Sequence, residues 1–158
     1  MAKPPEVPDI DADTPYKVAI GRLIEARFDE MMSHLDGTIS GKDPEDLHQM
    51  RVGSRRLRAA MDVAVDCFPP RFRYFHSTIK ELTDVLGGVR DFDVLRETLT
   101  AYRDSRPEAE RATINAMLRS CRAEREVGRE ALLAFFERLE RERFEVRFRG
   151  FIAEHTIG

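Results

Sequence analysis

A histidine and four arginines lie close together in the segment HQMRVGSRRLR, residues 48–58. Successive residues of an α-helix are about 100° apart, so four of these side chains would share an arc of about 80°: His48, Arg51, Arg55 and Arg58. Arginine offers a planar fork of N–H donors that matches phosphate oxygens, and a protonated histidine donates through both ring nitrogens. The spacing therefore predicts an anion-binding face. Arg56 points away from this arc, and we expect it to make a structural salt bridge.

The basic arc borders the apolar stripe of the same predicted helix. Charges on a face that is only solvated usually lie opposite the core and have mixed signs. Here no acid lies between Asp46 and Asp62. Like charges three or four residues apart repel each other and lower helix stability. Two explanations follow: an anionic ligand neutralises the arc, or the acidic N-terminal segment forms intramolecular ion pairs with it.

A second basic edge follows in the next predicted helix. One flank of its apolar stripe carries Arg73, His76, Lys80 and Arg90. Two neighbouring helices with basic edges would form a groove. Forked arginine donors and the point charge of lysine suit a phosphate-rich anion in such a groove.

Arg125 falls in the middle of an apolar stripe of a later helix, with Gly128 close by. A buried charge is costly unless it is paired. Three alternatives are open for Arg125. It pairs with an acid in the core, it extends to the surface, or it reaches the same anionic site.

The charge is unevenly distributed along the chain, whose net charge is −3. Residues 1–47 have a net charge of −6, residues 48–90 of +4 and residues 91–158 of −1. The overall acidity therefore hides a basic middle segment. An anionic partner is expected, whereas indiscriminate binding of nucleic acid is not. The pattern predicts neither a metal site nor a cofactor.

Helical periodicity runs through the whole chain, and no segment shows the alternation of a strand. We expect an all-α antiparallel helical bundle. The first helix would begin at the cap Thr14-Pro15 and end at Asp36-Gly37, and the second would begin at Asp43-Pro44 and end at Phe68-Pro69-Pro70. A third would span 72–86, Gly87-Gly88 would weaken or bend it, and a fourth would span 89–102. Ser105 and Glu108 would form a capping box before a long fifth helix, and a short sixth would hold 144–152.

Length and composition favour one domain. The chain of 158 residues is long enough to bury a core. Apolar runs such as ALLAFF are too short to span a bilayer, and the N-terminus lacks the apolar segment of a signal peptide. Cys67 and Cys121 lie in apolar helical patterns typical of reduced core cysteines. We therefore expect a cytoplasmic protein with a disordered acidic leader, 1–13, and a single helical domain, 14–158.

Two segments together resemble the CHAD family, the conserved-histidine α-helical domains. The first is HQMRVGSRRLR and the second is LTDVLGGVRDFDVL. The residues that match the two family motifs are His48, Arg51, Arg55, Arg56 and Arg58, then Leu86, Gly87, Arg90, Asp91, Asp93, Val94 and Leu95. Lys80 also falls where the family tends to have a basic residue. The order and the distance of the two motifs make the resemblance specific.

The resemblance implies a helical fold of two similar lobes around a basic cavity, and binding of inorganic polyphosphate. In some members it also implies association with polyphosphate granules or with triphosphate-processing enzymes. The match covers the first lobe, and no second helix with a histidine and arginines follows residue 110. We therefore expect one lobe with an exposed basic face, and a homodimer that polyphosphate tightens.

Two other functions would use the same residues. A metal-dependent phosphohydrolase would need Asp91 and Asp93 to bind a metal ion and His48 to act as a general base. Residues at i and i+2 point to different helix faces, so we expect Asp91 instead to cap a helix or to pair with Arg90 or Arg55. Nucleic-acid binding is opposed by the acidic total charge and by the lack of helix-turn-helix spacing. The favoured prediction is a domain that binds a polyanion and is not an enzyme.

Overall fold

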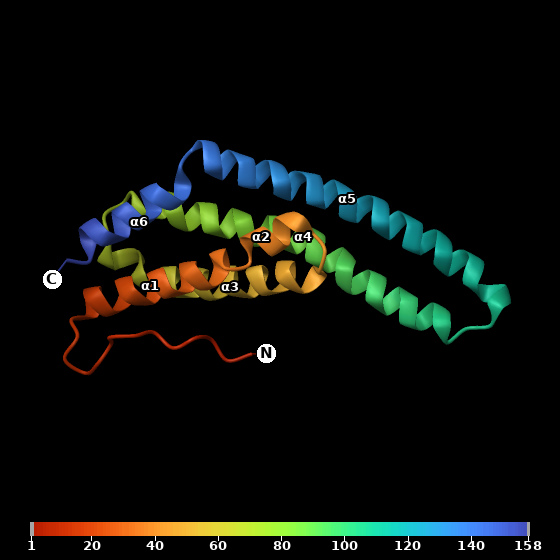
Figure 1. Ribbon diagram of the computed structural model, residues 1–158, viewed down its shortest axis with the longest axis horizontal. Helices are drawn as coiled ribbons and strands as arrows, with labels where there is room; N and C mark the ends of the chain where they lie inside the picture. The colour runs from red at the N-terminus through yellow and green to blue at the C-terminus, as the bar shows by residue number, and fades with distance from the viewer. Residues whose placement is uncertain (1, 158) are drawn as a thin grey trace.

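The computed structural model describes residues 2–157, and within that range it contains helices and no strand. The elements are α1 (Tyr16–Met32), α2 (Leu35–Ser40), α3 (Pro44–Ala64), η1 (Val65–Cys67), α4 (Phe72–Asp104), η2 (Glu108–Glu110), α5 (Arg111–Arg141) and α6 (Phe144–His155). Figure 1 shows α1, α3, α4 and α5 running alternately in opposite directions. The predicted all-α antiparallel bundle is therefore confirmed.

The start and end of α3 agree with the sequence. The carboxylate of Asp43 accepts a hydrogen bond from the backbone N–H of Glu45 at 2.9 Å, and Pro44 occupies the first helical position. This cap satisfies one of the N–H groups that have no partner within the helix. After Ala64 the chain tightens into η1, and Pro69 and Pro70 prevent the helix from continuing.

Both the predicted start and the predicted end of the first helix are wrong. Thr14 is not the N-cap, because its hydroxyl donates to the carboxylate of Asp11 at 2.8 Å and Pro15 occupies the cap position. The helix ends at Met32, before the predicted stop, and Asp36-Gly37 lies inside α2. The chain turns at Gly41, whose φ of 67° favours glycine.

The end of α2 is held by a residue that is distant in sequence. Arg129 of α5 donates to the carbonyl oxygen of Thr38 at 3.1 Å and to that of Ile39 at 2.5 Å. Carbonyl groups at the end of a helix lack partners within it. The guanidinium therefore caps α2, a long-range contact that no local pattern indicates.

The prediction that Gly87-Gly88 weakens or bends a helix is wrong, because α4 continues unbroken from Phe72 to Asp104. The α3 helix approaches Gly87 closely, and α5 approaches the backbone of Gly88 through its own glycine, Gly128. A methyl group added at Gly87 would lie 3.3 Å from Nε of Arg51, and one added at Gly128 of α5 would lie 3.0 Å from the carbonyl oxygen of Gly88. Tertiary packing thus offsets the low helix propensity of glycine.

The predicted capping box before the fifth helix is absent. The Ser105 hydroxyl donates to the carbonyl oxygen of Tyr102 at 2.7 Å, and Glu108 begins the turn η2. The long helix α5 starts only at Arg111. Its predicted length and that of the short last helix α6 are confirmed.

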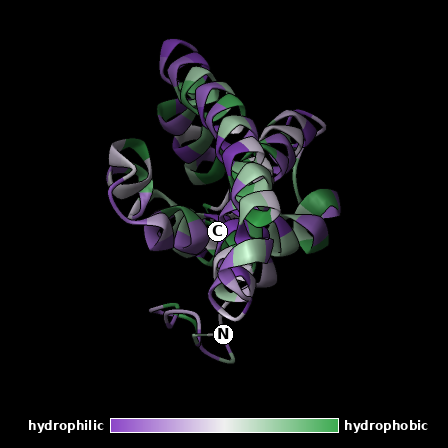
Figure 2. Cartoon of the chain, turned by 90° about the vertical axis from the view of Figure 1, so that its right-hand side faces the viewer, coloured by the Kyte–Doolittle hydropathy of each residue, from purple (hydrophilic) through white to green (hydrophobic). Residues whose placement is uncertain are grey.

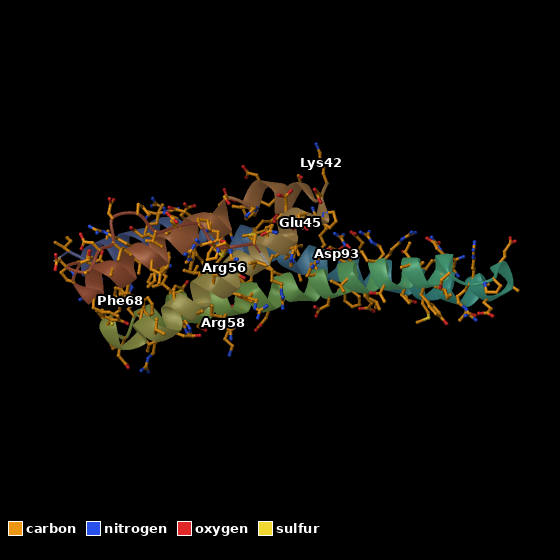
Figure 3. All side chains as sticks on the ribbon, turned by 90° about the horizontal axis from the view of Figure 1, so that it is seen from below. Lys42, Glu45, Arg56, Arg58, Phe68 and Asp93 are labelled. Atoms are coloured by element: carbon orange, nitrogen blue, oxygen red, sulfur yellow. The ribbon has the colours of Figure 1, made fainter. Side chains whose placement is uncertain are left out.

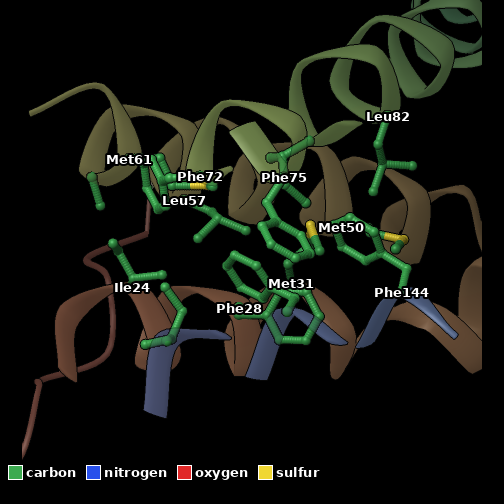
Figure 4. Close-up of a cluster of buried hydrophobic side chains, with 14 of the residues drawn as sticks. Ile24, Phe28, Met31, Met50, Leu57, Met61, Phe72, Phe75, Leu82 and Phe144 are labelled. Atoms are coloured by element: carbon green, nitrogen blue, oxygen red, sulfur yellow. The ribbon is translucent and has the colours of Figure 1, made fainter. Parts of the chain in front are cut away.

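The core lies where α1, α3, α4 and α6 meet (Figure 4). Phe75 of α4 is fully buried. Its ring centroid lies 5.7, 5.4 and 5.2 Å from those of Phe144, Phe148 and Phe151 of α6. Aromatic pairs at these separations stabilise a core beyond the area that they bury. Figure 2 shows hydrophilic and hydrophobic residues on the same helices, as expected for amphipathic helices around one core.

Beyond the bundle, α4 and α5 continue as a two-helix arm, residues 91–126 (Figure 1). The arm has a small core of its own, which consists of Leu99, Ile114 and Leu118. The bundle and the arm therefore depend on different buried residues, although α4 and α5 belong to both.

The N-terminal segment forms neither helix nor strand over residues 2–15. It lies beside the bundle (Figure 1), where Arg22 donates to the carbonyl oxygen of Asp9 and Arg56 donates to that of Ala2. The prediction that residues 1–13 are disordered stays a prediction. In the described part of this segment no carboxylate pairs with His48, Arg51, Arg55 or Arg58, so the explanation by intramolecular ion pairs is not supported.

Candidate anion-binding face

Three contacts fix how α3 and α4 lie against each other. Thr83 donates to the hydroxyl of Ser54 at 3.1 Å, and His76 lies 2.6 Å from the carboxylate of Asp62. The third contact is the packing of Arg51 against Gly87. The two helices are antiparallel, so the same register places Arg58 opposite Lys80 and His48 opposite Arg90.

Six predicted site residues are thereby brought together across α3 and α4, and we call them the basic face. They are His48, Arg51, Arg55 and Arg58 of α3, and Lys80 and Arg90 of α4. Arg55 and Lys80 are exposed, and the other four are half-buried. The described cavities lie elsewhere, and the larger, of about 480 Å³, is lined mainly by apolar core residues. The six residues thus form a basic face, and the groove predicted between the two helices stays a prediction.

The side chains of the basic face have no partner in the protein. None of these six side chains makes a hydrogen bond or ion pair with another residue of the range 2–157. Two buried nitrogens, Nδ1 of His48 and Nε of Arg51, are among the few buried polar atoms without a partner. A buried polar group without a partner costs about 1–3 kcal/mol. The face is therefore suited to an external acceptor of hydrogen bonds.

Arg56 has the surroundings that were predicted for it. Its guanidinium pairs with the carboxylate of Glu30 of α1, and Glu30 also pairs with Arg27 at 3.1 Å. In Figure 3 Arg56 lies on the α1 side of α3, and Arg58 lies on the α4 side. Arg56 matches the sequence motif but holds α3 against α1, and it does not belong to the basic face.

His76 and Arg73 lie at the end of the basic face. His76 is held by Asp62 at 2.6 Å, so its ring is engaged within the protein. Arg73 is exposed on the same flank of α4, about two turns before Lys80. Of these two predicted site residues, only Arg73 extends the row of cations that lack a partner.

Arg125 pairs with a core acid, which is one of the three alternatives that the sequence left open. Its Nε donates at 2.5 Å to the carboxylate of Asp93, which is 0 % exposed. Along α4, Asp93 points about 140° away from Lys80. Arg125 therefore stabilises the junction of bundle and arm and does not join the basic face.

Two carboxylates share the flank of Lys80, and sequence analysis missed their position. Asp84 and Asp91 follow Lys80 by four and eleven residues, which places both within about 40° of it on α4. Both are exposed. The prediction that Asp91 caps a helix is wrong, because Asp91 lies inside the continuous α4. Among the described residues Asp91 forms no ion pair with Arg90 or Arg55. The spacing from Lys80 is the signal that would have located both acids.

A bidentate ion pair joins α4 to α5 beside the basic face. Arg138 donates to both carboxylate oxygens of Glu81, at 3.2 and 3.1 Å. The hydrogen bond with Glu81 is the main cause that raises the pKa of Arg138 above its ordinary value. This bidentate pair holds α5 against the side of α4 next to Lys80.

Two properties of the described residues bear on the alternative functions. Among the described residues no group of three or more histidine, cysteine or acidic side chains is arranged to hold a metal ion. None of the helices in residues 2–157 combines the length and the apolar character of a membrane span. Both cysteines are free, with Cys121 buried and Cys67 partly buried.

Comparison with known proteins agrees with this architecture. The family model described as the CHAD domain matches residues 22–157. The crystal structure of the CHAD domain from the plant Ricinus communis is similar, with a TM-score of 0.68 and 29% sequence identity. The match covers 96% of this chain and 50% of that chain, so the protein spans about half the length of its structural relative. No curated protein matches the chain. Because the family model matches most of the sequence, the chain belongs to the CHAD domain family.

Proposed function

We propose that the protein binds inorganic polyphosphate through the basic face of α3 and α4. One observation supports this most directly. Six basic side chains lie together without partners in the described protein, although neighbouring arginines such as Arg56, Arg125 and Arg138 are paired with acids. The pairing of those arginines means that a shortage of acids does not explain the unpaired face.

A phosphate polymer suits the chemistry of this face. Arginine forks and the lysine ammonium form charge-assisted hydrogen bonds with phosphate oxygens, and such bonds are about twice as strong as neutral ones. The rows on α3 and α4 extend over several helical turns, so a long chain contacts more cations than a single phosphate does. Binding also relieves the repulsion among these like charges and releases counterions from the polymer.

Calorimetry with phosphate ligands of different length tests the proposal. The affinity should rise from orthophosphate to tripolyphosphate to long-chain polyphosphate, because longer chains span more of the basic face. It should fall steeply as salt concentration rises. Equal affinity for orthophosphate and the long polymer would contradict the proposal.

We infer that the domain binds polyphosphate without hydrolysing it. Of the two acids that a metal-dependent phosphohydrolase would use, Asp93 is buried and bound by Arg125, whereas Asp91 is exposed on another side of α4. The measurement is phosphate release from polyphosphate and nucleoside triphosphates with magnesium or manganese. Steady turnover would show that the domain is an enzyme.

Nucleic acid is the competing polyanion, and a sugar separates its successive phosphates, whereas polyphosphate joins its phosphates directly and has a higher charge density. We expect long-chain polyphosphate to displace single- or double-stranded nucleic acid from the protein far more readily than the reverse. A competition titration in one buffer measures this order. Association with polyphosphate granules or triphosphate-processing enzymes is a further part of the proposal, to be tested by co-sedimentation of the protein with granules.

A further inference from the structure

A second group of arginines lies on the arm, away from the basic face. A cavity of about 310 Å³ between α4 and α5 is lined by Arg103, Asn115, Leu118, Arg119 and Arg122. Three of its five lining residues are arginines. A cavity with this lining offers charged donors on both walls and an apolar floor at Leu118, which is buried.

The register of the arm adds a fourth arginine. Arg125 contacts Asp93 at 2.5 Å, and Arg103 donates to Oδ1 of Asn115 at 3.4 Å. The same register places Arg96 of α4 opposite Arg122 of α5. Arg96 and Arg103 are seven residues apart, so they lie on one flank of α4 about two turns from each other. The arginines therefore face each other along the cavity.

Few carboxylates compensate these charges. Arg119 and Arg122 are exposed, and neither pairs with another residue in the described part of the chain. Arg96 reaches Asp93 only at 4.0 Å, and Arg125 already holds that carboxylate. Arg103 is shared between Asp104 at 3.1 Å and Asn115.

The remaining acids of the arm are engaged or point elsewhere. Glu126, which lies on the same flank of α5, is held by Arg125 at 3.3 Å. Glu97 is about 100° from Arg96 around α4, and Glu124 is about 160° from Arg122 around α5. The cavity wall thus has an excess of positive charge, although the whole arm contains similar numbers of acids and bases.

We propose that this cavity is a second anion site, which takes a compact chain of phosphate groups such as inorganic tripolyphosphate, a terminal segment of a longer polyphosphate or the triphosphate group of a nucleotide. Arginine forks from two helices match non-bridging phosphate oxygens. Asn115 adds an N–H donor, because its oxygen already accepts from Arg103. Arg103 points about 140° away from Lys80 around α4, so the arm site and the basic face are distinct.

The sequence provides a site-specific signal for the test. The chain contains one asparagine, Asn115, and one glutamine, Gln49. Gln49 donates to Glu45 at 2.6 Å on α3 and is the chain neighbour of His48 of the basic face. In a nitrogen-15 spectrum of the full chain, the side-chain amide of Asn115 reports on the cavity, and that of Gln49 reports separately on the region of the basic face.

The experiment is a titration of the labelled protein with tripolyphosphate. The Asn115 amide should shift in a saturable way. The double variant Arg119→Ala/Arg122→Ala should weaken this binding by about tenfold or more, the usual effect of losing charge-assisted hydrogen bonds. Alanine retains the helix and adds no amide signal. The matched control is Arg141→Ala, an exposed arginine of α5 outside the cavity, which should bind tripolyphosphate like the native chain.

A second pair of variants separates this site from the basic face. Arg55→Ala/Lys80→Ala should weaken long-chain polyphosphate binding in calorimetry but change the Asn115 titration by less than about twofold. If the Asn115 amide signal does not shift at millimolar tripolyphosphate, the proposal of the arm site is wrong. That result does not affect the proposal of the basic face. Conversely, Arg55→Ala/Lys80→Ala could leave long-chain polyphosphate binding unchanged while the Asn115 amide still shifts with tripolyphosphate. The proposal of the basic face would then be wrong, and the proposal of the arm site would stand.

Parallel titrations identify the source of the phosphates. Equal responses of Asn115 to adenosine triphosphate and tripolyphosphate support a site that recognises the triphosphate group alone. A response to tripolyphosphate and not to the nucleotide supports a site for inorganic chains. A shift of Asn115 that persists unchanged in Arg119→Ala/Arg122→Ala would show that the arginines do not bind the anion, and would contradict the proposal.

Discussion

Arg55 and Arg56 are adjacent in sequence, but the fold gives them opposite tasks. Arg55 is exposed on the basic face without a partner, whereas Arg56 is held by Glu30 of α1. The paired guanidinium of Arg56 holds α3 against α1, whereas the unpaired guanidinium of Arg55 is available to a ligand. The two arginines therefore make a matched pair for separating stability from binding.

We expect Arg55→Ala to weaken polyphosphate binding by about tenfold, because one charge-assisted contact is lost. The free energy of unfolding should stay within about 0.5 kcal/mol of the native value or rise, because repulsion on α3 decreases. Arg56→Ala should do the reverse and destabilise the protein by about 1–3 kcal/mol with little effect on binding. Calorimetry and urea unfolding of both variants check this. A large loss of stability in Arg55→Ala would favour a structural role for the face.

Removing the charge of Asp84 should strengthen polyphosphate binding, in contrast to Arg55→Ala. It is an exposed carboxylate on the flank of Lys80, so it repels a bound polyanion. Asp84→Asn should tighten polyphosphate binding about two- to fivefold, with the largest gain at low salt, where surface charges are screened least. The control Glu154→Gln removes an exposed acid of α6 and should leave the affinity unchanged. If Asp84→Asn does not change the affinity for polyphosphate, the bound polymer does not pass close to this flank of α4.

At the residue scale, helical spacing predicted much of the candidate site. The shared arc of His48, Arg51, Arg55 and Arg58, and the separate direction of Arg56, follow from periodicity alone. The partner of Arg125 did not follow, because Asp93 is distant in sequence and the pairing depends on how α4 crosses α5. Likewise, the engagement of His76 by Asp62 requires the α3–α4 register.

At the element scale, the two adjacent glycines of α4 differ in what they contact. A methyl group added at Gly87 would meet Arg51, whereas one added at Gly88 would meet no atom within 4 Å. Helix propensity alone favours alanine over glycine by about 1 kcal/mol at either position. The difference between the two substitutions therefore measures how Gly87 positions Arg51.

We expect Gly88→Ala to raise the free energy of unfolding by about 0.5–1 kcal/mol and to leave polyphosphate binding unchanged. Gly87→Ala should gain less stability and weaken binding about fivefold, because Arg51 is pushed out of position. Thermal unfolding and calorimetry on the two variants provide the measurement. Identical binding by both variants would show that Arg51 adapts freely to the methyl group.

The bounds of some helices were predictable from the sequence and those of others were not, depending on whether local or distant residues determine them. The start of α3 was predictable because its cap is local, within Asp43, Pro44 and Glu45. The continuity of α4 through Gly87-Gly88 was not, because the close approach of Arg51 of α3 to Gly87 is a contact between residues that are distant in sequence. The short helix α2 was missed for the same reason, since Arg129 of α5 caps it.

At the scale of the whole molecule, the basic face lies on one side of a chain that spans about half of its structural relative. The arm and the bundle also expose apolar side chains, among them Tyr102, Met117 and Val127. A two-fold dimer would cover such a surface with the same surface of a second copy. Repulsion between two basic faces opposes the dimer, and a polyanion that bridges them favours it.

We therefore expect a weak homodimer that polyphosphate tightens by mass action. Light scattering coupled to size exclusion, with and without polyphosphate of defined length, measures the mass of the particle. The dimer fraction should rise with long-chain polyphosphate and should not rise with orthophosphate at equal phosphate concentration. A strict monomer in both conditions that still binds the polymer tightly would show that one copy suffices.

The small core of the arm affects how the protein unfolds locally. Leu99, Ile114 and Leu118 are the buried apolar contacts of a long hairpin, whereas the bundle shares a large aromatic cluster. Proteins unfold locally in cooperative units whose free energies follow their buried contacts. Backbone amides around Leu99 and Leu118 should therefore exchange with deuterium orders of magnitude faster than those around Phe75 and Leu57. Tripolyphosphate bound between α4 and α5 should slow exchange most in the arm, because the arm has the smaller core and gains the most from a ligand that joins its two helices.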